Sequence, residues 1–592
     1  MNSEKKTINE PAETEVTIIG AGIIGLLNAL QIAKRGIKVT IIDDIIHQKR
    51  SYKVGESLLV FSNTFLRTIG ELDEFLQTSY PKDGVWFTYG MENSTSFKNK
   101  TEWAFTTQSN WYNELPNNKL YRSMYYDKQL VRPEAEDLLR AKVHAHTNIT
   151  FFDSGRVQDV IFYDNSDYHD VQWLCRLSKE KRITRTKWVI DCSGRNRLLA
   201  RKFNHAVDFK DDFQTTAVWA QFEGITDDLF GNEWIYKYSS GSNSSRNNHT
   251  CHLWGKGYWM WIIRLANNRI SIGVTFDQRM PPEGEKPKEK FWNIINRYPL
   301  LKNVLKQDNM LEFRMYKDIQ YLTDTFVSPK RYGILGDAAS IIDAYYSQGI
   351  SLSLVTSWHT TNIIEQDLRH NNLDTDYIDL VNRATKQDWL MMRNVIKEKY
   401  TTAIEDSRFF ILSHLLDSIM FTAALKNRWW LTHWLVKTDG DTMNESESNK
   451  KIRQKLQKHL YYSQMKPWHS LSPSRVQKIQ SFLQKRLAER ARWRLDNNVK
   501  LSALKAVTPS LPKLWLLPWG HKKNTIDISV EFQNPQKFFP KEHELSPLSM
   551  RMAAPMMMIF FFMAYAFDGV STTLYKLINT FSFKRKRHHK TN

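Results

Sequence analysis

Three glycines near the N-terminus have the spacing of a phosphate-binding turn. Gly20, Gly22 and Gly25 directly follow a short apolar run. In such a turn the first glycine permits a sharp bend and the second lets a pyrophosphate approach the backbone. The third lets a helix pack closely on the preceding strand. Asp43 ends the next apolar run, where a carboxylate can bind ribose hydroxyls, so this spacing predicts a dinucleotide-binding site.

The residues around the glycines predict the elements that position them. The pattern favours a strand ending at Ile19, a helix from about Ile23 to Lys34, and a strand over Val39–Ile42. The start of that helix offers N–H groups and the positive end of its dipole to a phosphate.

A second strand–turn–helix unit occurs far along the chain. A short strand over residues 331–336 ends at Gly336, Asp337 follows, and a long helix is expected to start near Gly349. The unit predicts a second backbone site for an anion or a polar ring edge. A simple strand-to-helix link is the alternative.

A lysine and a pair of tryptophans are further candidates. Lys82 lies in a turn before an alternating strand, and residue pattern alone favours solvent exposure for it. Trp259, Trp261 and Ile263 share one face of a predicted strand because side chains alternate along strands. Two aligned indoles can wall off an apolar cavity or belong to an ordinary sheet core, and the pattern does not choose.

Composition places limits on the protein class. The chain has 592 residues, 41% hydrophobic, with a formal net charge of +20. That charge suits nucleic acid, an anionic membrane or an acidic partner, or simply a basic surface. We find no nucleic-acid-binding signature and expect no nucleic-acid partner. The three cysteines form no CxxC pair, so no metal site is predicted, and the polar N-terminus indicates a cytoplasmic body.

The C-terminus differs in character. Residues 553–567 form an uninterrupted apolar run, shorter than the roughly 20 residues that span a bilayer, and the chain ends in KRKRHHKTN. An apolar segment beside a basic cluster suits an in-plane helix on an anionic leaflet. We therefore expect residues 553–587 to contact a membrane surface, at the inner face of the cell membrane. A helix buried against the body or in a dimer is the alternative.

Taken in order, these motifs resemble the flavin-dependent halogenases of the tryptophan and phenol type, within the FAD monooxygenase superfamily. The resemblance covers roughly residues 14–360. The matching segments are GAGIIG (20–25), VGES (54–57), YPKDGVWFTYG (80–90), DCSGRNRLLA (191–200), WMWII (259–263) and GDAASIIDAYYSQGIS (336–351). The lysine and the Trp-x-Trp-x-Ile strand are the more specific parts.

The resemblance implies an α/β fold: a Rossmann-like FAD-binding domain with an inserted antiparallel β-sheet substrate domain and a helical C-terminal extension. The expected ranges are a polar tail (1–13), the FAD-binding domain (14–204 and 331–365), the substrate domain (205–330), the helical region (366–545) and the membrane-associating tail (546–592).

The resemblance also implies the site residues, with FAD as cofactor. In this family reduced FAD, supplied by a separate flavin reductase, uses oxygen to oxidise a halide, and a lysine delivers the halogen to an aromatic ring. Lys82 is the implied catalytic lysine, and Trp259, Trp261 and Ile263 line the substrate pocket. The implied FAD contacts are Gly20, Gly22, Gly25, Asp43, Glu56, Arg132, Gly336, Asp337, Gly349 and Ile350. The implied halide contacts are Ser347, Gln348 and Gly349.

Departures from the family pattern bear on the substrate and the reaction. Arg264 replaces the hallmark proline, Ala344 replaces a second proline, and Tyr346 stands where the tryptophan-acting branch has a glutamate. We therefore expect a phenol-like or pyrrole-like substrate, lipophilic or carrier-bound. A hydroxylating monooxygenase, a geranylgeranyl-reductase-like lipid reductase and a membrane scaffold that retains FAD are the alternatives.

Overall fold

The computed structural model describes residues 12–46, 51–106, 117–164, 166–209, 211–238, 243–423, 425–458, 473–507, 525–527 and 548–588. Most of the predicted polar tail, and the part of the predicted helical region between 528 and 547, lie outside these residues. The side chains of the C-terminal basic cluster also lie outside them.

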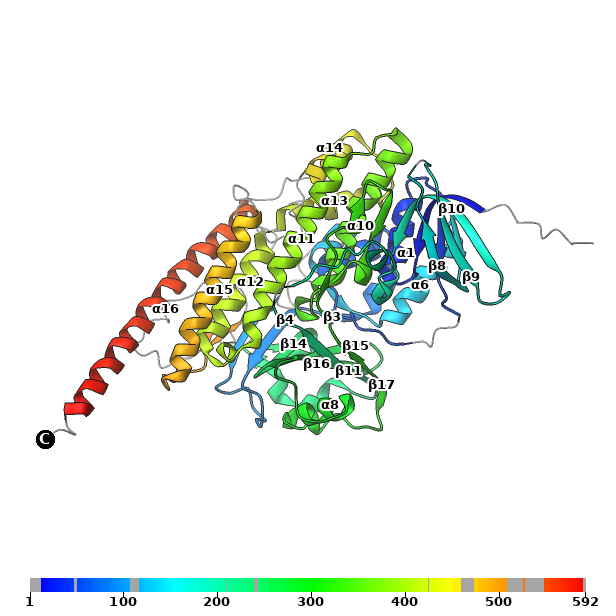
Figure 1. Ribbon diagram of the computed structural model, residues 1–592. Coiled ribbons are helices and arrows are strands. Elements are labelled where there is room, and N and C mark those ends of the chain that lie inside the picture. The colour runs from blue at the N-terminus through cyan, green and yellow to red at the C-terminus, as the bar shows by residue number, and fades with distance from the viewer. Residues whose placement is uncertain are drawn as a thin grey trace, which may run out of the picture.

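A Rossmann-like sheet holds the glycine turn (Figure 1). Its path is β19-β20-β10-β1-β2-β7, and β9 pairs with β10 and β8 beside it. The central pairs are parallel, as expected where helices cover both faces of a sheet. Its strands are β1 (Ala12–Ile19), β2 (Val39–Ile42), β7 (Ile149–Phe152), β8 (Gly155–Ile161), β9 (His169–Cys175), β10 (Lys181–Asp191), β19 (Val327–Ser328) and β20 (Tyr332–Ile334).

Two helices that start at the predicted turns pack on each other. These are α1 (Ile23–Ala33) and α10 (Gln348–His370), close to their predicted starts. Asn28 and Gln31 of α1 donate to the Ser357 hydroxyl of α10 at 2.9 and 2.8 Å. These buried bonds fix the first glycine turn relative to the second, although they are more than 300 residues apart.

The second sheet is mixed, not purely antiparallel. Its order is β17-β11-β16-β15-β14-β4-β5-β22-β23, and the β4–β14, β5–β22 and β22–β23 pairs are parallel. Its strands are β4 (Gly84–Tyr89), β5 (Thr101–Thr106), β11 (Thr215–Phe222), β14 (His249–Gly255), β15 (Tyr258–Leu265), β16 (Arg269–Asp277), β17 (Met310–Tyr316), β22 (Lys505–Val507) and β23 (Thr525–Asp527). The sheet therefore takes strands from both sides of the predicted 205–330 range.

The two faces of β15 enter different cores. Trp259, Trp261 and Ile263 belong to the large core shared with the Rossmann domain. Met260 and Ile262 belong to a second core. Period-two alternation produces this division, and it points the predicted tryptophan face toward the flavin domain.

A strand from the C-terminal region closes the edge of the second sheet. β22 pairs with β5, so Ala506 lies opposite Trp103. Lys505 Nζ contacts the fully buried Glu102 carboxylate at 2.6 Å, and Arg246 reaches the same carboxylate at 2.5 Å. The edge is thus held by charge pairing as well as by backbone bonds.

Long helices from the second half of the chain cover the body beside this sheet (Figure 1). The helix α16 continues well past the predicted apolar run, and its C-terminal end projects from the body (Figure 1). The remaining helices and short strands are α2 (Val60–Thr68), α3 (Asp73–Thr78), α5 (Lys119–Tyr125), α6 (Arg132–Ala145), α7 (Leu198–Lys202), α8 (Pro287–Ile295), α9 (Pro299–Lys302), α11 (Thr375–Lys397), α12 (Ser407–Ala423), α13 (Leu425–Thr438), α14 (Glu447–Lys458), α15 (Pro473–Asp496), α16 (Leu548–His588), β3 (Tyr80–Lys82), β6 (Asp127–Gln129), β12 (Ile235–Lys237), β13 (Asn243–Ser245), β18 (Tyr321–Leu322) and β21 (Ser340–Ile341).

Candidate active site

The glycine turn has the geometry of a nucleotide cradle. Gly20 has a φ of +102°, and a Cβ there would lie 2.3 Å from the Cys192 carbonyl oxygen. A Cβ on Gly25 would lie 2.1 Å from the Gly20 carbonyl oxygen. A Cβ on Gly22, by contrast, would meet no atom within 4 Å. The first and third glycines are therefore required by packing, while the second leaves the space that a pyrophosphate needs.

Asp43 closes this cradle. It follows β2, and its carboxylate accepts the Ala21 N–H of the turn at 2.7 Å. It also accepts the Asp44 N–H at 2.7 Å. The acid is therefore fixed beside the turn, where the motif predicts a ribose contact. The residues present fit a dinucleotide.

The second turn lies against the first. A Cβ on Gly336, which has a φ of +65°, would lie 3.4 Å from the Ile24 side chain of α1. The next residue, Asp337, is exposed and lies in the electrostatic range of Arg132, Arg195 and Arg197. An acid among arginines at the end of a strand fits the predicted contact with the ribityl-pyrophosphate region.

The loop before α2 completes this region. Arg132 donates to the Val54 carbonyl at 3.0 Å and pairs with Glu136 at 2.9 Å. A Cβ on Gly55 would lie 2.5 Å from the Arg132 guanidinium and 3.1 Å from Ile350. Burial raises the pKa of the neighbouring Glu56 to about 7. The structure thus brings together Arg132, Glu56 and Ile350, and their roles toward FAD stay predictions.

Lys82 is buried, so the interpretation of this residue as an exposed loop lysine is wrong. Its side chain is fully inaccessible, and its Nζ donates to the Leu58 carbonyl at 3.0 Å. The Asp127 carboxylate lies 3.4 Å away on the paired strand β6. Burial lowers the pKa of Lys82, and the charge of Asp127 opposes that shift. A desolvated lysine beside one acid has the environment of a functional group.

An aromatic layer lies beside Lys82. The Phe87 and His252 rings stack with centroids 4.3 Å apart, and His252 lies 5.3 Å from Trp259 and 5.7 Å from Tyr345. Burial is the main cause of the low pKa of His252, about 3, and the Lys82 charge adds to it. The layer therefore extends from His252, which lies within the electrostatic range of Lys82, to Tyr345, two residues before the predicted halide segment.

The tryptophan pair is tied to that segment by hydrogen bonds. Trp259 Nε1 donates to the Tyr400 hydroxyl at 2.6 Å, which in turn donates to the Asp343 carboxylate at 3.0 Å. Asp343 accepts the Tyr345 N–H at 3.1 Å, and burial raises its pKa to about 6. Trp261 contributes to the same wall, with its ring centroid 5.8 Å from that of Trp259.

The predicted halide segment forms the start of α10. Ser347 adopts a left-handed conformation with φ 54° and ψ 33°, and the helix begins at Gln348. A Cβ on Gly349 would meet no atom within 4 Å. The first N–H groups of a helix favour an anion. The contacts of Ser347, Gln348 and Gly349 with a halide stay predictions.

Residues from the C-terminal region support this segment, and the sequence analysis did not find them. The Tyr345 hydroxyl donates to His414 Nε2 at 2.6 Å, and His414 Nδ1 donates to the Phe410 carbonyl at 2.6 Å. Lys399 lies over the Tyr345 ring and pairs with Asp417 at 2.9 Å. No local motif marks these residues, because their role depends on how α12 packs against the sheet.

Comparison with known proteins agrees with the fold and the cradle. The family described as an FAD binding domain matches residues 13–357, more than half of the chain. The chain therefore belongs to this family, with FAD as its cofactor.

The curated relatives that this chain resembles include flavin-dependent halogenases. The halogenase chlA of Dictyostelium discoideum is 27% identical over 391 residues, which are 61% of each chain. The halogenase ptaM of Pestalotiopsis fici is 24% identical over 387 residues, covering 62% of this chain and 65% of the relative. The chain thus spans about three fifths of the length of these curated relatives.

Solved structures of halogenases share the fold. The halogenase PltM in complex with phloroglucinol and FAD has a TM-score of 0.64 at 16% identity, covering 82% of this chain and 92% of that one. The brominase Bmp2 has a TM-score of 0.53 at 18% identity, covering 76% and 99%. At these identities the likeness establishes the architecture only.

Proposed function

We propose that the protein is a two-component, FAD-dependent halogenase. It would use reduced FAD, oxygen and a halide to halogenate an electron-rich aromatic that is lipophilic or carrier-bound. A separate reductase would supply the reduced flavin. The observation that carries the proposal is Lys82, buried with Asp127 across the aromatic layer from the start of α10.

Each group in the site has a part in this chemistry. Bound reduced FAD would activate oxygen, and oxygen supplies the oxidising equivalents that convert halide to hypohalous acid. The N–H groups of Ser347, Gln348 and Gly349 would hold the halide. The aromatic layer would keep the substrate ring away from the flavin. Lys82, oriented by the Leu58 carbonyl and Asp127, would donate a proton to the hypohalous oxygen, which leaves as water while the halogen bonds to a ring carbon. The proton lost from that ring carbon would return to the Lys82 amine.

A small cavity near Gln348 offers a less suitable halide position. Its volume is about 20 Å³, and its wall includes Tyr345 and the carboxyl-bearing side chain of Asp417. The Asp417 carboxylate is paired with Lys399 at 2.9 Å and supplies no donor for a halide on this wall, so we place the halide at the backbone N–H groups of α10.

The departure at Arg264 does not favour the hydroxylase alternative. Arg264 is buried, and its guanidinium bonds the Asp227 carboxylate at 2.9 Å. The same carboxylate accepts the Tyr80 hydroxyl at 2.8 Å, two residues before Lys82. Through Asp227, Arg264 thus helps to hold strand β3 in position, a structural role that is compatible with halogenation.

The test uses FAD-loaded protein, a flavin reductase, bromide and a chemical trap for hypohalous acid, with phloroglucinol as the aromatic probe. We expect the wild type to brominate both. Lys82→Ala should keep trap bromination and lose ring bromination by about 10²- to 10⁴-fold. Lys128→Ala is the matched control, because Lys128 lies on the neighbouring strand β6 and donates to the carbonyls of Gln77 and Ser79.

Two outcomes would contradict the proposal. Peroxide release without brominated trap, with hydroxylated probe, would favour the monooxygenase. Equal loss of ring bromination in Lys82→Ala and Lys128→Ala would remove the assigned role of Lys82.

We also propose that the protein lies peripherally on the inner face of the cell membrane through α16. The stretch Ala554–Phe581 is long and apolar enough to cross a membrane, yet 33% of its most apolar window is buried. Asp568 within it is fully buried with arginine partners, and such a cluster is costly at a bilayer centre. An in-plane position therefore suits α16 better. Alkaline washing of membranes should release the protein; retention would indicate a spanning helix.

A further inference from the structure

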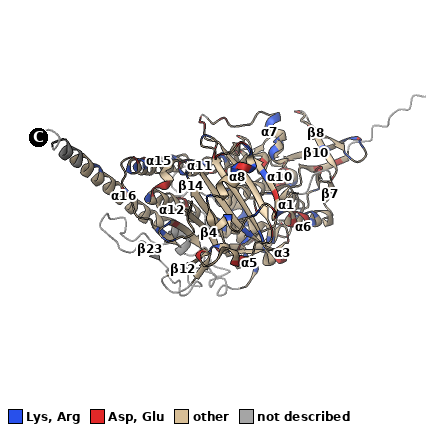
Figure 2. Cartoon of the chain, turned by 90° about the horizontal axis from the view of Figure 1, so that it is seen from below, with Lys and Arg blue, Asp and Glu red and all other residues tan. Residues whose placement is uncertain are grey.

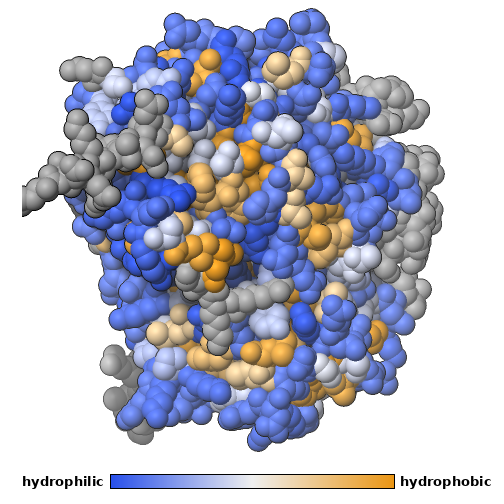
Figure 3. Space-filling view, turned by 90° about the vertical axis from the view of Figure 1, so that its right-hand side faces the viewer, coloured by the Kyte–Doolittle hydropathy of each residue, from blue (hydrophilic) through white to orange (hydrophobic). Residues whose placement is uncertain are grey.

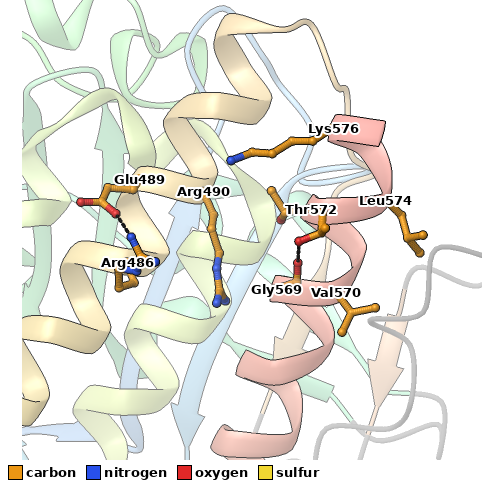
Figure 4. A pocket seen from close by; sticks show the side chains of 9 residues that line it. Arg486, Glu489, Arg490, Gly569, Val570, Thr572, Leu574 and Lys576 are labelled. Carbon is orange, nitrogen blue, oxygen red and sulfur yellow. Dashed lines mark hydrogen bonds and ion pairs between the residues drawn. The ribbon is translucent and has the colours of Figure 1, made fainter. Parts of the chain in front are cut away.

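The surface between α15 and α16 contains a groove away from the flavin site. Its volume is about 490 Å³ (Figure 4). One wall is formed by α15 and the other by α16 (Figure 4). The lining residues on α15 are Arg486, Glu489 and Arg490, and those on α16 are Gly569, Val570, Thr572, Thr573, Leu574 and Lys576. Cations, hydroxyls and aliphatic groups thus meet in one place.

Buried ion pairs hold the two walls in position. Arg494 of α15 pairs with Asp568 of α16 at 2.9 Å and with Asp406 at 2.8 Å. Arg490 donates to the Tyr565 carbonyl at 2.9 Å and lies over the Tyr565 ring. A Cβ on Gly569 would lie 2.8 Å from the Arg490 guanidinium, so a glycine is needed for this approach. The groove is therefore pre-formed.

The groove carries excess positive charge. Glu489 pairs with Arg486 at 2.9 Å. Three arginines, at positions 408, 490 and 494, share two carboxylates, those of Asp568 and Asp406. Lys576 Nζ lies 5.2 Å from the centroid of the Trp493 ring. Among the described residues, no carboxylate lies within salt-bridge distance of Lys576. Such a cluster attracts an anion.

The groove opens onto an apolar surface. Exposed side chains on α16 lie in it and directly beyond it: Val570, Leu574, Leu577, Ile578 and Phe581. The coloured part of the projecting helix α16 is mostly tan, that is, uncharged (Figure 2), whereas the opposite face of the body is mostly polar (Figure 3). A free phosphate would contact only the cationic side chains of the groove. A phospholipid would contact these cations through its phosphate and the apolar side chains of α16 through its acyl chains.

We propose that this groove binds the phosphate of an anionic phospholipid, with the acyl chains along the exposed apolar face of α16. Arg486, Lys576 and the Thr573 hydroxyl would contact the headgroup. The inference rests on the proposed membrane association and adds a site of headgroup selection to it.

The test measures partitioning of the full-length, FAD-loaded protein onto phosphatidylcholine vesicles with and without phosphatidylglycerol. Arg486→Gln with Lys576→Gln should reduce binding to the anionic vesicles about thirtyfold, or about fivefold per cation. Binding to neutral vesicles should stay unchanged. The control is Arg182→Gln with Lys330→Gln, on strand β10 and in the loop after β19. It removes two positive charges, as the test pair does, but far from the groove.

Other results would overturn the inference in distinguishable ways. Equal losses in the test and control pairs would mean that net charge alone drives binding. If the wild type binds no vesicles, the membrane proposal fails as well. If Leu577→Ser with Ile578→Ser loses all vesicle binding while the test pair loses none, membrane association stands and the headgroup site fails. If inorganic phosphate displaces the protein from anionic vesicles, the groove binds a free anion instead.

Discussion

Two buried lysines flank the aromatic layer, and their partners differ. Lys399 Nζ lies 2.9 Å from Asp417, and both side chains are at most 2% exposed. Lys82 Nζ lies 3.4 Å from Asp127, whose side chain is 14% exposed, and it donates to a carbonyl as well. Burial lowers the pKa of both lysines. A buried lysine–aspartate pair thus occurs twice. The Lys399–Asp417 pair is short and closed to solvent, and we assign it a role in stability. The Lys82–Asp127 pair is longer and partly exposed, and we assign it a role in catalysis.

The closed pair should give the largest effect on stability. Lys399→Met leaves Asp417 buried without its cation, and we expect a loss of about 3–5 kcal/mol in the free energy of unfolding. Adding Asp417→Leu should restore most of it, because the uncompensated charge is gone. Denaturant unfolding of the FAD-loaded protein measures both variants. A loss from Lys82→Met as large as that from Lys399→Met would erase the distinction between the pairs.

The Lys82–Asp127 pair should determine the pH above which the rate of ring bromination declines, the alkaline limb of its pH profile. The proposed role needs Lys82 protonated, so ring bromination should fall as the pH rises through its pKa, which burial lowers below the usual range of a lysine. Asp127→Asn removes the charge that raises this pKa, and the limb should move to lower pH. Rates of ring bromination across pH test this, with trap bromination as the internal control. Activity that rises through this range would indicate a neutral, haloamine-forming lysine.

The smallest effect should come from the hydrogen bonds that link the tryptophan wall to the halide segment. Tyr400→Phe removes the hydroxyl shared by Trp259 and Asp343. We expect a loss of about 1–3 kcal/mol in stability and a few-fold rise in the bromide KM. Tyr163→Phe, at an exposed tyrosine of the Rossmann domain, is the control. An unchanged bromide KM would show that Tyr400 only supports packing.

Local motifs made part of this site predictable. The glycine turn was predictable from Gly20, Gly22 and Gly25, because turn geometry depends on residues adjacent in the sequence. The strand β2 and the helix α10 also lie close to their predicted positions. The face of β15 that carries the tryptophans was also predictable, because side chains alternate along a strand. Whether that face lines a cavity or a packed core could not be predicted.

Contacts between distant residues were not predictable from the sequence alone. The burial of Lys82 depends on Asp127, which is supplied by a strand 45 positions later. The supports of the halide segment, Tyr400 and His414, come from a region without a recognisable motif. The mixed character of the second sheet likewise depends on where β4 and β22 pair, which no local pattern records.

The strand β22 has a consequence for synthesis of the protein. Residues 505–507 cover β5, and Lys505 supplies a cation to the buried Glu102. A ribosome must therefore add about 400 further residues before the sheet edge laid down at residues 101–106 is covered. An uncovered edge strand pairs readily with other chains. Premature termination after α10 and before β22 would release a product whose sheet is open to aggregation, even though its FAD cradle is complete.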